Sequence, residues 1–360
     1  MGATPVRTTL ALSLLAGVLL WAPHPAVAAA GSSDTTVPST TLSVGVSGTR
    51  TVAANTPVTA SGRVQAPAGG LLAQVGGIVL SLLQAVLQPL TGVGGAKVAL
   101  ELQTPTGWST YSSATANAAG SYAVSVPTSA YGTHTWRIST AATATSAAAA
   151  TAPFRVAVPT PYRPRGSARS YRLLPDGHAR WNPCTPVPYY VNTAGMPRGA
   201  MTTVRQALAQ VQAATGLTFR YAGRSRGVPF ATGTNVAGMP SYGFTIAWAS
   251  PKKVRQLRGS TVAISGSWSQ IAQLSPTRYA QQYVAGGLVI DRTERLRTGM
   301  GRGRTLGFVL MHEMGHVVGL DHTRDTSQVM SAYLTSRSQT QYGAGDLAGF
   351  AAVGFGGGCL

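Results

Sequence analysis

Three histidines and one glutamate lie within eleven residues of this chain, at a spacing that suits a metal ion. His312 and His316 are four residues apart, so on a helix they share one face and can bind one ion together. Glu313 lies between them and can reach a water on that ion. Gly319 lets the chain leave the helix in a left-handed turn, and His322 follows as a third nitrogen ligand. Three protein nitrogens with an open fourth position are typical of a catalytic zinc.

The pattern H-E-x-x-H-x-x-G-x-x-H is more specific than its first five positions. A bare H-E-x-x-H also occurs on amphipathic helices whose histidines are merely buried and hydrogen-bonded, and the added Gly and His remove most such matches. The chain has nine acidic residues in total, three of them Glu, and one of these three occupies the position of a general base. The sequence therefore favours a zinc hydrolase site over a structural helix.

The residues around the motif predict the elements that position it. Leu306, Val309 and Leu310 form an apolar stripe at helical spacing that continues through the motif, and Thr305 can cap the start of that helix. Met330 follows fourteen residues after His316 in a short apolar segment. The first two ligands are thus expected on a buried, rigid helix.

These residues resemble the metzincin clan of zinc endopeptidases and, within it, the matrixin-like branch. Met330 matches the clan's Met-containing turn below the zinc, 286–291 resembles the strand before the zinc helix, and 345–350 resembles the start of the C-terminal helix. Ala332 stands where matrixins usually have Pro. The resemblance covers about residues 180–360 and implies an α+β catalytic domain with a twisted sheet and three helices.

The resemblance also implies roles for individual residues. His312, His316 and His322 would hold one catalytic zinc, and Glu313 would act as the general base toward the zinc-bound water that attacks a peptide carbonyl. Met330 would form an apolar floor below the histidines without binding the metal.

Four further positions are interpreted from the same resemblance. An edge strand around 284–289 would hold an extended peptide substrate by strand addition. Asp346 would cap the last helix and tie it to the zinc helix. Asp291 and Glu294 occupy positions where matrixins hold calcium, and an ordinary solvated pair is the alternative. Tyr333 is interpreted as a core or turn residue rather than a catalytic one.

The N-terminus and the cysteines indicate an exported protein. Residues 1–28 read as a signal peptide, with an apolar run from Leu10 to Leu20 and an A-x-A cleavage site, and 29–40 as a disordered Ser/Thr/Ala-rich segment. We therefore expect a secreted, extracellular protein, with cell-surface association as a further option. In that compartment Cys184 and Cys359 are expected to form a disulfide. The alternative is a free Cys184 thiolate that blocks the zinc.

The charge of the chain is strongly basic, with 28 Lys plus Arg against 9 Asp plus Glu and a net charge of +19. From Tyr162 onward we count 22 basic and 7 acidic residues. The basic residues are scattered and no aromatic–basic ladder accompanies them, so nucleic-acid binding is not expected. An anionic cell-envelope polymer is a more suitable partner.

The N-terminal half predicts a separate all-β domain. Short alternating segments over 41–158, divided by turn residues, indicate an Ig-like β-sandwich that precedes the catalytic domain. An uncharged insertion at 71–90 carries apolar residues at helical spacing; it would pack on the sandwich, contact a membrane or cover the cleft. The Pro/Arg-rich 159–179 is interpreted as a linker, and 180–360 as the zinc metalloprotease domain.

The sequence thus predicts a secreted zinc metalloendopeptidase with one catalytic zinc and a protein or peptide substrate. Two other classes remain. One is a cell-surface binding protein in which the Ig-like module dominates; the other is a zinc amidase that acts on cell-wall peptides.

Overall fold

The computed structural model describes residues 40–67, 90–143, 147–175, 179–231, 238–336 and 338–360. The predicted signal peptide, nearly all of 29–40 and the body of the 71–90 insertion lie outside these residues. No helix among the described residues has the length and apolarity needed to cross a membrane.

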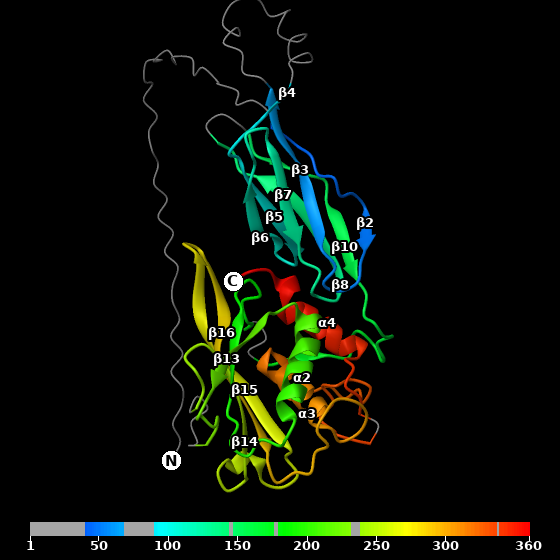
Figure 1. Ribbon diagram of the computed structural model, residues 1–360, viewed down its shortest axis with the longest axis vertical. Coiled ribbons are helices and arrows are strands. Elements are labelled where there is room, and N and C mark those ends of the chain that lie inside the picture. Colours follow the sequence, from blue (N-terminus) through cyan, green and yellow to red (C-terminus); the bar gives the residue numbers. More distant parts are fainter. Residues whose placement is uncertain (1–39, 68–89, 144–146, 176–178, 232–237, 337) are drawn as a thin grey trace, which may run out of the picture. The chain divides into compact units, whose positions relative to one another are not determined.

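The N-terminal region consists of strands in two sheets (Figure 1). One sheet contains β1 (Thr41–Leu42), β3 (Val58–Pro67), β4 (Leu90–Gly92) and β7 (Ser121–Val126). The other contains β2 (Thr49–Thr51), β5 (Lys97–Thr104), β6 (Gly107–Thr115), β8 (Gly132–Thr140), β9 (Ala149–Ala150) and β10 (Phe154–Val158).

Alternate residues of these strands bury one face, as the sequence pattern predicts. In β5, Val98, Leu100 and Leu102 are almost inaccessible to solvent and join residues of both sheets in one core. The described residues of this region are therefore rich in strands, with two sheets sharing a core. Its relation to Ig domains stays a prediction.

The C-terminal region is built on a five-stranded sheet in the order β13-β12-β14-β16-β15. β12, β13, β14 and β16 run parallel, and only β15 is antiparallel to its neighbour. The bounds are β12 Val187–Val191, β13 Phe219–Arg224, β14 Gly243–Ala249, β15 Ala263–Ser275 and β16 Arg278–Asp291. β14 is buried along its whole length, as a strand covered on both faces must be.

Three helices of the described residues lie on one side of this sheet (Figure 1). They are α2 (Ala200–Thr215), α3 (Leu306–Val317) and α4 (Ala344–Val353). Val204, Leu208 and Val211 form a buried stripe of α2 at helical spacing, and Gly216 ends the helix with φ 73°. The shorter elements are β11 (Arg172–Leu173), β17 (Leu320–Asp321) and the 3-10 turns Arg255–Leu257 and Phe355–Gly357.

The sheet order corrects one expectation. The strand at 284–289 was expected at the edge, but β16 pairs with β14 on one side and with β15 on the other. β15 is the edge strand, and it lies next to α3. Strand order depends on pairing between distant residues, which hydrophobic periodicity does not encode.

The chain's last residues are fixed at several points. Cys184 and Cys359 form the predicted disulfide, so the alternative of a free Cys184 thiolate is wrong. The Arg180 guanidinium donates to the carbonyl oxygens of Gly357 and Gly358 at 2.7 and 2.5 Å. Phe355 is buried in the core of the N-terminal strands, within the same compact unit of Val37–Leu360.

Candidate metal centre

The helix that carries the motif begins and ends where its sequence predicts. Thr305 is the N-cap of α3, and its side-chain oxygen accepts a hydrogen bond from the backbone N–H of Phe308 at 3.2 Å. Two residues past the helix, Gly319 has φ 115°, a conformation that disfavours side chains with a Cβ. The chain then forms β17, which pairs with β11 and leads directly into His322.

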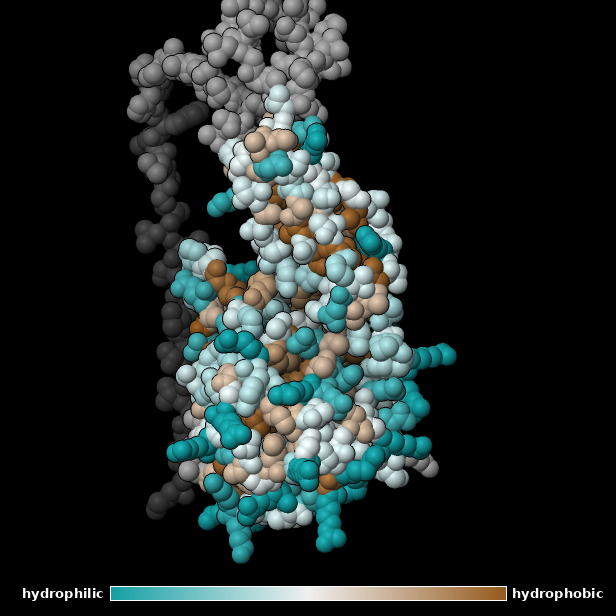
Figure 2. Space-filling model, viewed as in Figure 1, coloured by the Kyte–Doolittle hydropathy of each residue, from teal (hydrophilic) through white to brown (hydrophobic). Residues whose placement is uncertain are grey.

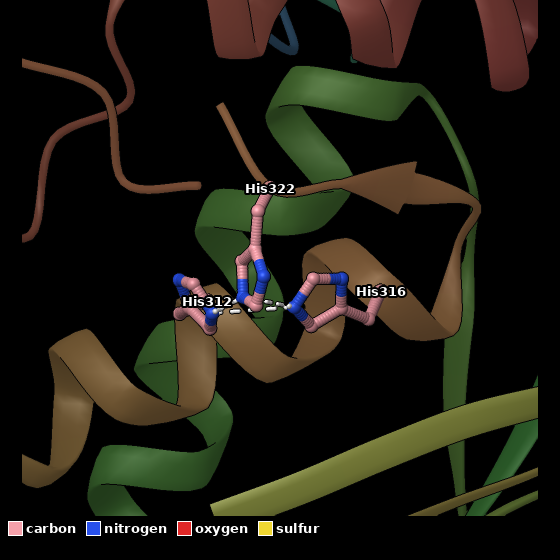
Figure 3. Close-up of side chains that lie close together, drawn as sticks. All are labelled: His312, His316 and His322. Carbon is pink, nitrogen blue, oxygen red and sulfur yellow. Dashed lines mark hydrogen bonds between the residues drawn. The ribbon is translucent and has the colours of Figure 1, made fainter. Parts of the chain in front are cut away.

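The three histidines converge on one point (Figure 3). The Nε2 atom of His312 lies 3.2 Å from that of His316 and 3.1 Å from that of His322, and the third pair of Nε2 atoms is 3.1 Å apart. In a tetrahedral site with Zn–N bonds of about 2.0–2.1 Å, two ligand nitrogens lie about 3.3 Å apart. The observed triangle therefore has the size of one face of a zinc tetrahedron.

Hydrogen bonds at the opposite ring nitrogens fix the tautomers. Nδ1 of His312 donates to the Val329 carbonyl oxygen at 2.7 Å, and Nδ1 of His316 donates to the Leu320 carbonyl oxygen at 2.7 Å. Each neutral ring then carries its lone pair on Nε2, toward the centre of the triangle. Two lone pairs that converge beside His322 Nε2 suit a cation at the centre of the triangle, so the residues present fit zinc.

Burial keeps these rings neutral. The pKa values of His312 and His316 are lowered to about 4, mainly by desolvation; neighbouring histidines also lower them, whereas the hydrogen bonds to the Val329 and Leu320 carbonyl oxygens act in the opposite direction. A metal ligand must be deprotonated, so both rings are in their binding form at neutral pH. Among the described residues, these three histidines form the one cluster of His, Cys, Asp and Glu of metal-site size.

Glu313 is buried beside the triangle, with 7% of its surface exposed. Its Oε2 accepts a hydrogen bond from the Ser265 hydroxyl at 2.6 Å, and Ser265 Oγ also lies 2.9 Å from the Glu313 carbonyl oxygen. Burial raises the pKa of the Glu313 carboxyl, and His316 and Ser265 act in the opposite direction. A raised pKa suits a carboxylate that must accept and return a proton near neutral pH.

The segment around Met330 packs against the ligand helix and against the strand end that carries His322. The Met330 side chain is buried against Gly315, which lies between His312 and His316 on α3; a Cβ at Gly315 would lie 2.1 Å from Met330 Sδ. The carbonyl oxygen of Met330 accepts from the backbone N–H of Thr323 at 3.0 Å, next to His322. Met330 thus packs beneath the ligand helix, as its sequence position predicts.

Asp346 holds this same segment in place. Its carboxylate accepts from the backbone N–H groups of Val329, Met330 and Gly343 at 2.7, 3.1 and 2.9 Å. It therefore caps α4, as expected, but the tie runs to the Met330 turn rather than to the zinc helix. Burial raises the pKa of Asp346 to about 6, although the three N–H donors act to lower it.

The histidines and Glu313 open into a cleft of about 850 Å³. The start of β15 and the residues before it line this cleft, together with the segment after Met330. Phe308 and Val309 of α3, Leu334 and the exposed Tyr333 also line it. An edge strand on one side of a metal centre can bind an extended peptide by strand addition.

Comparison with known families agrees with this geometry. The Matrixin family model matches residues 245–353, from β14 to α4 and including all three histidines. Residues 245–353, below called the matrixin region, are therefore similar to matrixins. Together with the histidine triad, the match indicates a zinc metalloendopeptidase, and the sheet with its three helices fits the α+β fold of that family. No curated protein matches the chain.

The structure changes two interpretations of residues in the matrixin region. Tyr333 is 72% exposed, so it is not a core residue. Asp291 is buried and accepts from Thr293, and Glu294 pairs with Arg304 at 2.7 Å, so the two carboxylates are not a solvated pair. Calcium at these positions has no support in their contacts.

Sequence reasoning missed Ser265. A serine in a strand carries no sign of its partner, and its contact with Glu313 arises because β15 lies beside α3, 48 residues away in sequence. The contact became visible only once the sheet order was known.

Proposed function

We propose that this protein is an exported zinc endopeptidase that hydrolyses peptide bonds in extended polypeptide segments, with Glu313 as the general base. The convergence of three imidazoles beside a buried carboxylate, inside an open cleft, is the observation that supports this function most strongly. Zinc in this position supplies a Lewis acid and a water of lowered pKa.

The chain's own residues then perform three tasks. Nδ1 contacts to Val329 and Leu320 keep His312 and His316 in the tautomer that presents Nε2 to the ion. The Glu313 carboxylate takes a proton from the attacking water and delivers it to the departing amine. Ser265 donates to Glu313 Oε2, which holds the carboxylate in one rotamer.

Export is part of the proposal. The positively charged start, the apolar run from Leu10 to Leu20 and the A-x-A sequence support a signal peptide. The disulfide between Cys184 and Cys359 supports an oxidising compartment. Mass spectrometry of protein recovered from the culture medium tests this directly: a mature N-terminus near Ala29 is expected, and retention of residues 1–28 inside the cell would contradict export.

Casein and purified cell wall are substrates that distinguish an endopeptidase from a cell-wall amidase. An endopeptidase releases peptides from casein and leaves wall peptides intact, whereas an amidase does the reverse. We expect chelation to abolish casein cleavage and zinc to restore it. Wall hydrolysis without casein cleavage would replace our proposal with the amidase. Envelope binding that is indifferent to loss of Glu313 would favour the surface-binding alternative.

A further inference from the structure

β15 and β16 continue well beyond the rest of the sheet as a two-stranded ribbon. Their register runs from Ala263 opposite Ile290 to Ser275 opposite Arg278, while β14 accompanies β16 only as far as Ala285. Figure 1 shows this ribbon, in yellow, projecting past the neighbouring strands. Its outer part contains the residues 268–282.

Large apolar side chains on this ribbon are exposed. Trp268, Ile271 and Tyr279 have 52%, 73% and 59% of their surface accessible to solvent. Ile271 lies opposite Gln281 and Tyr279 lies opposite Gln273, so Ile271 and Tyr279 project from the same face. In Figure 2, brown apolar surface marks the ribbon, while teal hydrophilic side chains cover much of the matrixin region.

The ribbon also differs from its surroundings in charge. Between Gly259 and Ile290 the one charged residue is Arg278, although the chain from Tyr162 onward carries 22 basic residues. Natural edge strands are normally protected by lysines, prolines or bulges, because an uncharged edge pairs with other chains. β15 has no Lys and no Pro along its thirteen residues, and its pairing with β16 is irregular only between Trp268 and Ser269 and between Gln273 and Ser275. Such an edge fits an uncharged partner in extended conformation.

The same strand connects this surface to the catalytic cleft. Ser265 of β15 touches the general base, and Ser267 Oγ donates to the Val317 carbonyl oxygen at the end of α3. Ile271 is six residues beyond Ser265, which corresponds to about 20 Å along a strand. A peptide paired with β15 at the metal centre therefore reaches Ile271 if it extends about six residues further in that direction.

We propose that the outer ribbon is an exosite that binds an uncharged, apolar segment of the polypeptide substrate, continuing the strand pairing that begins in the cleft. This inference rests on the proposed endopeptidase function. Antiparallel pairing is the more stable form, and it places substrate residues N-terminal to the cleaved bond on the ribbon. The substrate class is accordingly long, unfolded or extended protein segments rather than short peptides.

The test compares substrate length in two variants of the full chain. One variant combines Trp268→Ser, Ile271→Ser and Tyr279→Ser; the control is Tyr221→Ser, an exposed aromatic on β13 at the opposite edge of the sheet. The substrates are a six-residue fluorogenic peptide and the same peptide extended by ten uncharged residues on its N-terminal side. A third peptide carries the extension on its C-terminal side.

For the wild type we expect the N-terminal extension to raise kcat/KM about tenfold, mainly through KM. The triple variant should lose this gain and cleave the six-residue peptide at the wild-type rate, and Tyr221→Ser should change neither value. An equal gain in wild type and triple variant, or a gain confined to the C-terminal extension, would overturn the exosite.

Other occupants of the ribbon have distinct signatures. Sedimentation of wild type and triple variant reveals a second copy of the chain, and flotation with anionic vesicles reveals a membrane. Loss of either association without a change in long-peptide cleavage would also overturn the proposal. If the zinc-loaded wild type cleaves no substrate, the endopeptidase function itself is wrong. If it cleaves all peptides without a gain from the N-terminal extension, only the exosite is wrong.

Discussion

Removal of the disulfide between Cys184 and Cys359 should cost a large part of the protein's stability. The two residues are 175 positions apart, so the bond closes almost the entire catalytic region into one loop. The loop-entropy relation gives about 17 cal/mol/K for a loop of this length, or about 5 kcal/mol at 25 °C. Since whole domains are stable by only about 5–15 kcal/mol, the double substitution Cys184→Ser/Cys359→Ser should be strongly destabilised.

Other contacts also hold the C-terminal tail, so the double substitution tests the effect of loop closure on the unfolded chain. Arg180 bonds to Gly357 and Gly358, and the Asn182 amide donates to the Leu360 carbonyl oxygen, so the native tail stays in place without the disulfide. The stability is therefore expected to fall because the unfolded chain gains conformational freedom without the disulfide. Residual structure in the unfolded chain would reduce this loss of stability toward about 3 kcal/mol.

Urea unfolding followed by tryptophan fluorescence measures this difference. The double variant should unfold at a lower urea concentration than oxidised wild type, and reduced wild type should match the double variant. Reductant should leave the variant unchanged. A double variant with the midpoint of oxidised wild type would refute the reasoning, since it would show that closing this loop contributes nothing.

Three further predictions concern the site. Asp346→Asn should lower the unfolding free energy by about 1–3 kcal/mol in the same urea assay, because its amide nitrogen cannot accept from a buried N–H. The contribution of His312 and His316 to apoprotein stability should be complete above pH 6.5 and fall as the pH drops toward 4, because their pKa values are lowered to about 4. Each ring accounts for up to roughly 3 kcal/mol, and replacing both by Gln should remove this part of the pH dependence of the urea midpoint and leave the opposite contribution of Asp346, whose pKa is raised to about 6. Ser265→Ala should lower kcat about tenfold with zinc content unchanged, and an unaltered kcat would remove Ser265 from the positioning of the general base.

The local part of the site was predictable from the sequence, because short-range geometry determines it. The four-residue spacing of His312 and His316 requires a shared helix face, and Gly319 permits the turn that returns His322. The cap at Thr305 follows from the same kind of local rule. These features involve residues at most ten positions apart.

Features that depend on distant pairing were not predictable in the same way. The edge position of β15 follows from strand order, and the contact between Ser265 and Glu313 follows from that order in turn. Asp346 was assigned correctly to the cap of α4, but its donors at Val329 and Met330 come from a turn sixteen and seventeen residues away. An alternating pattern shows which face of a strand is buried, but it does not determine which strands lie beside it in the sheet.

In the proposed mechanism one zinc, held by three histidines, works together with Glu313. The most direct measurement is zinc content and peptide cleavage in wild type and Glu313→Gln, prepared side by side. We predict one zinc per chain in both proteins, and cleavage in wild type alone. Cleavage by Glu313→Gln at the wild-type rate, or by wild type stripped of zinc, would contradict the account.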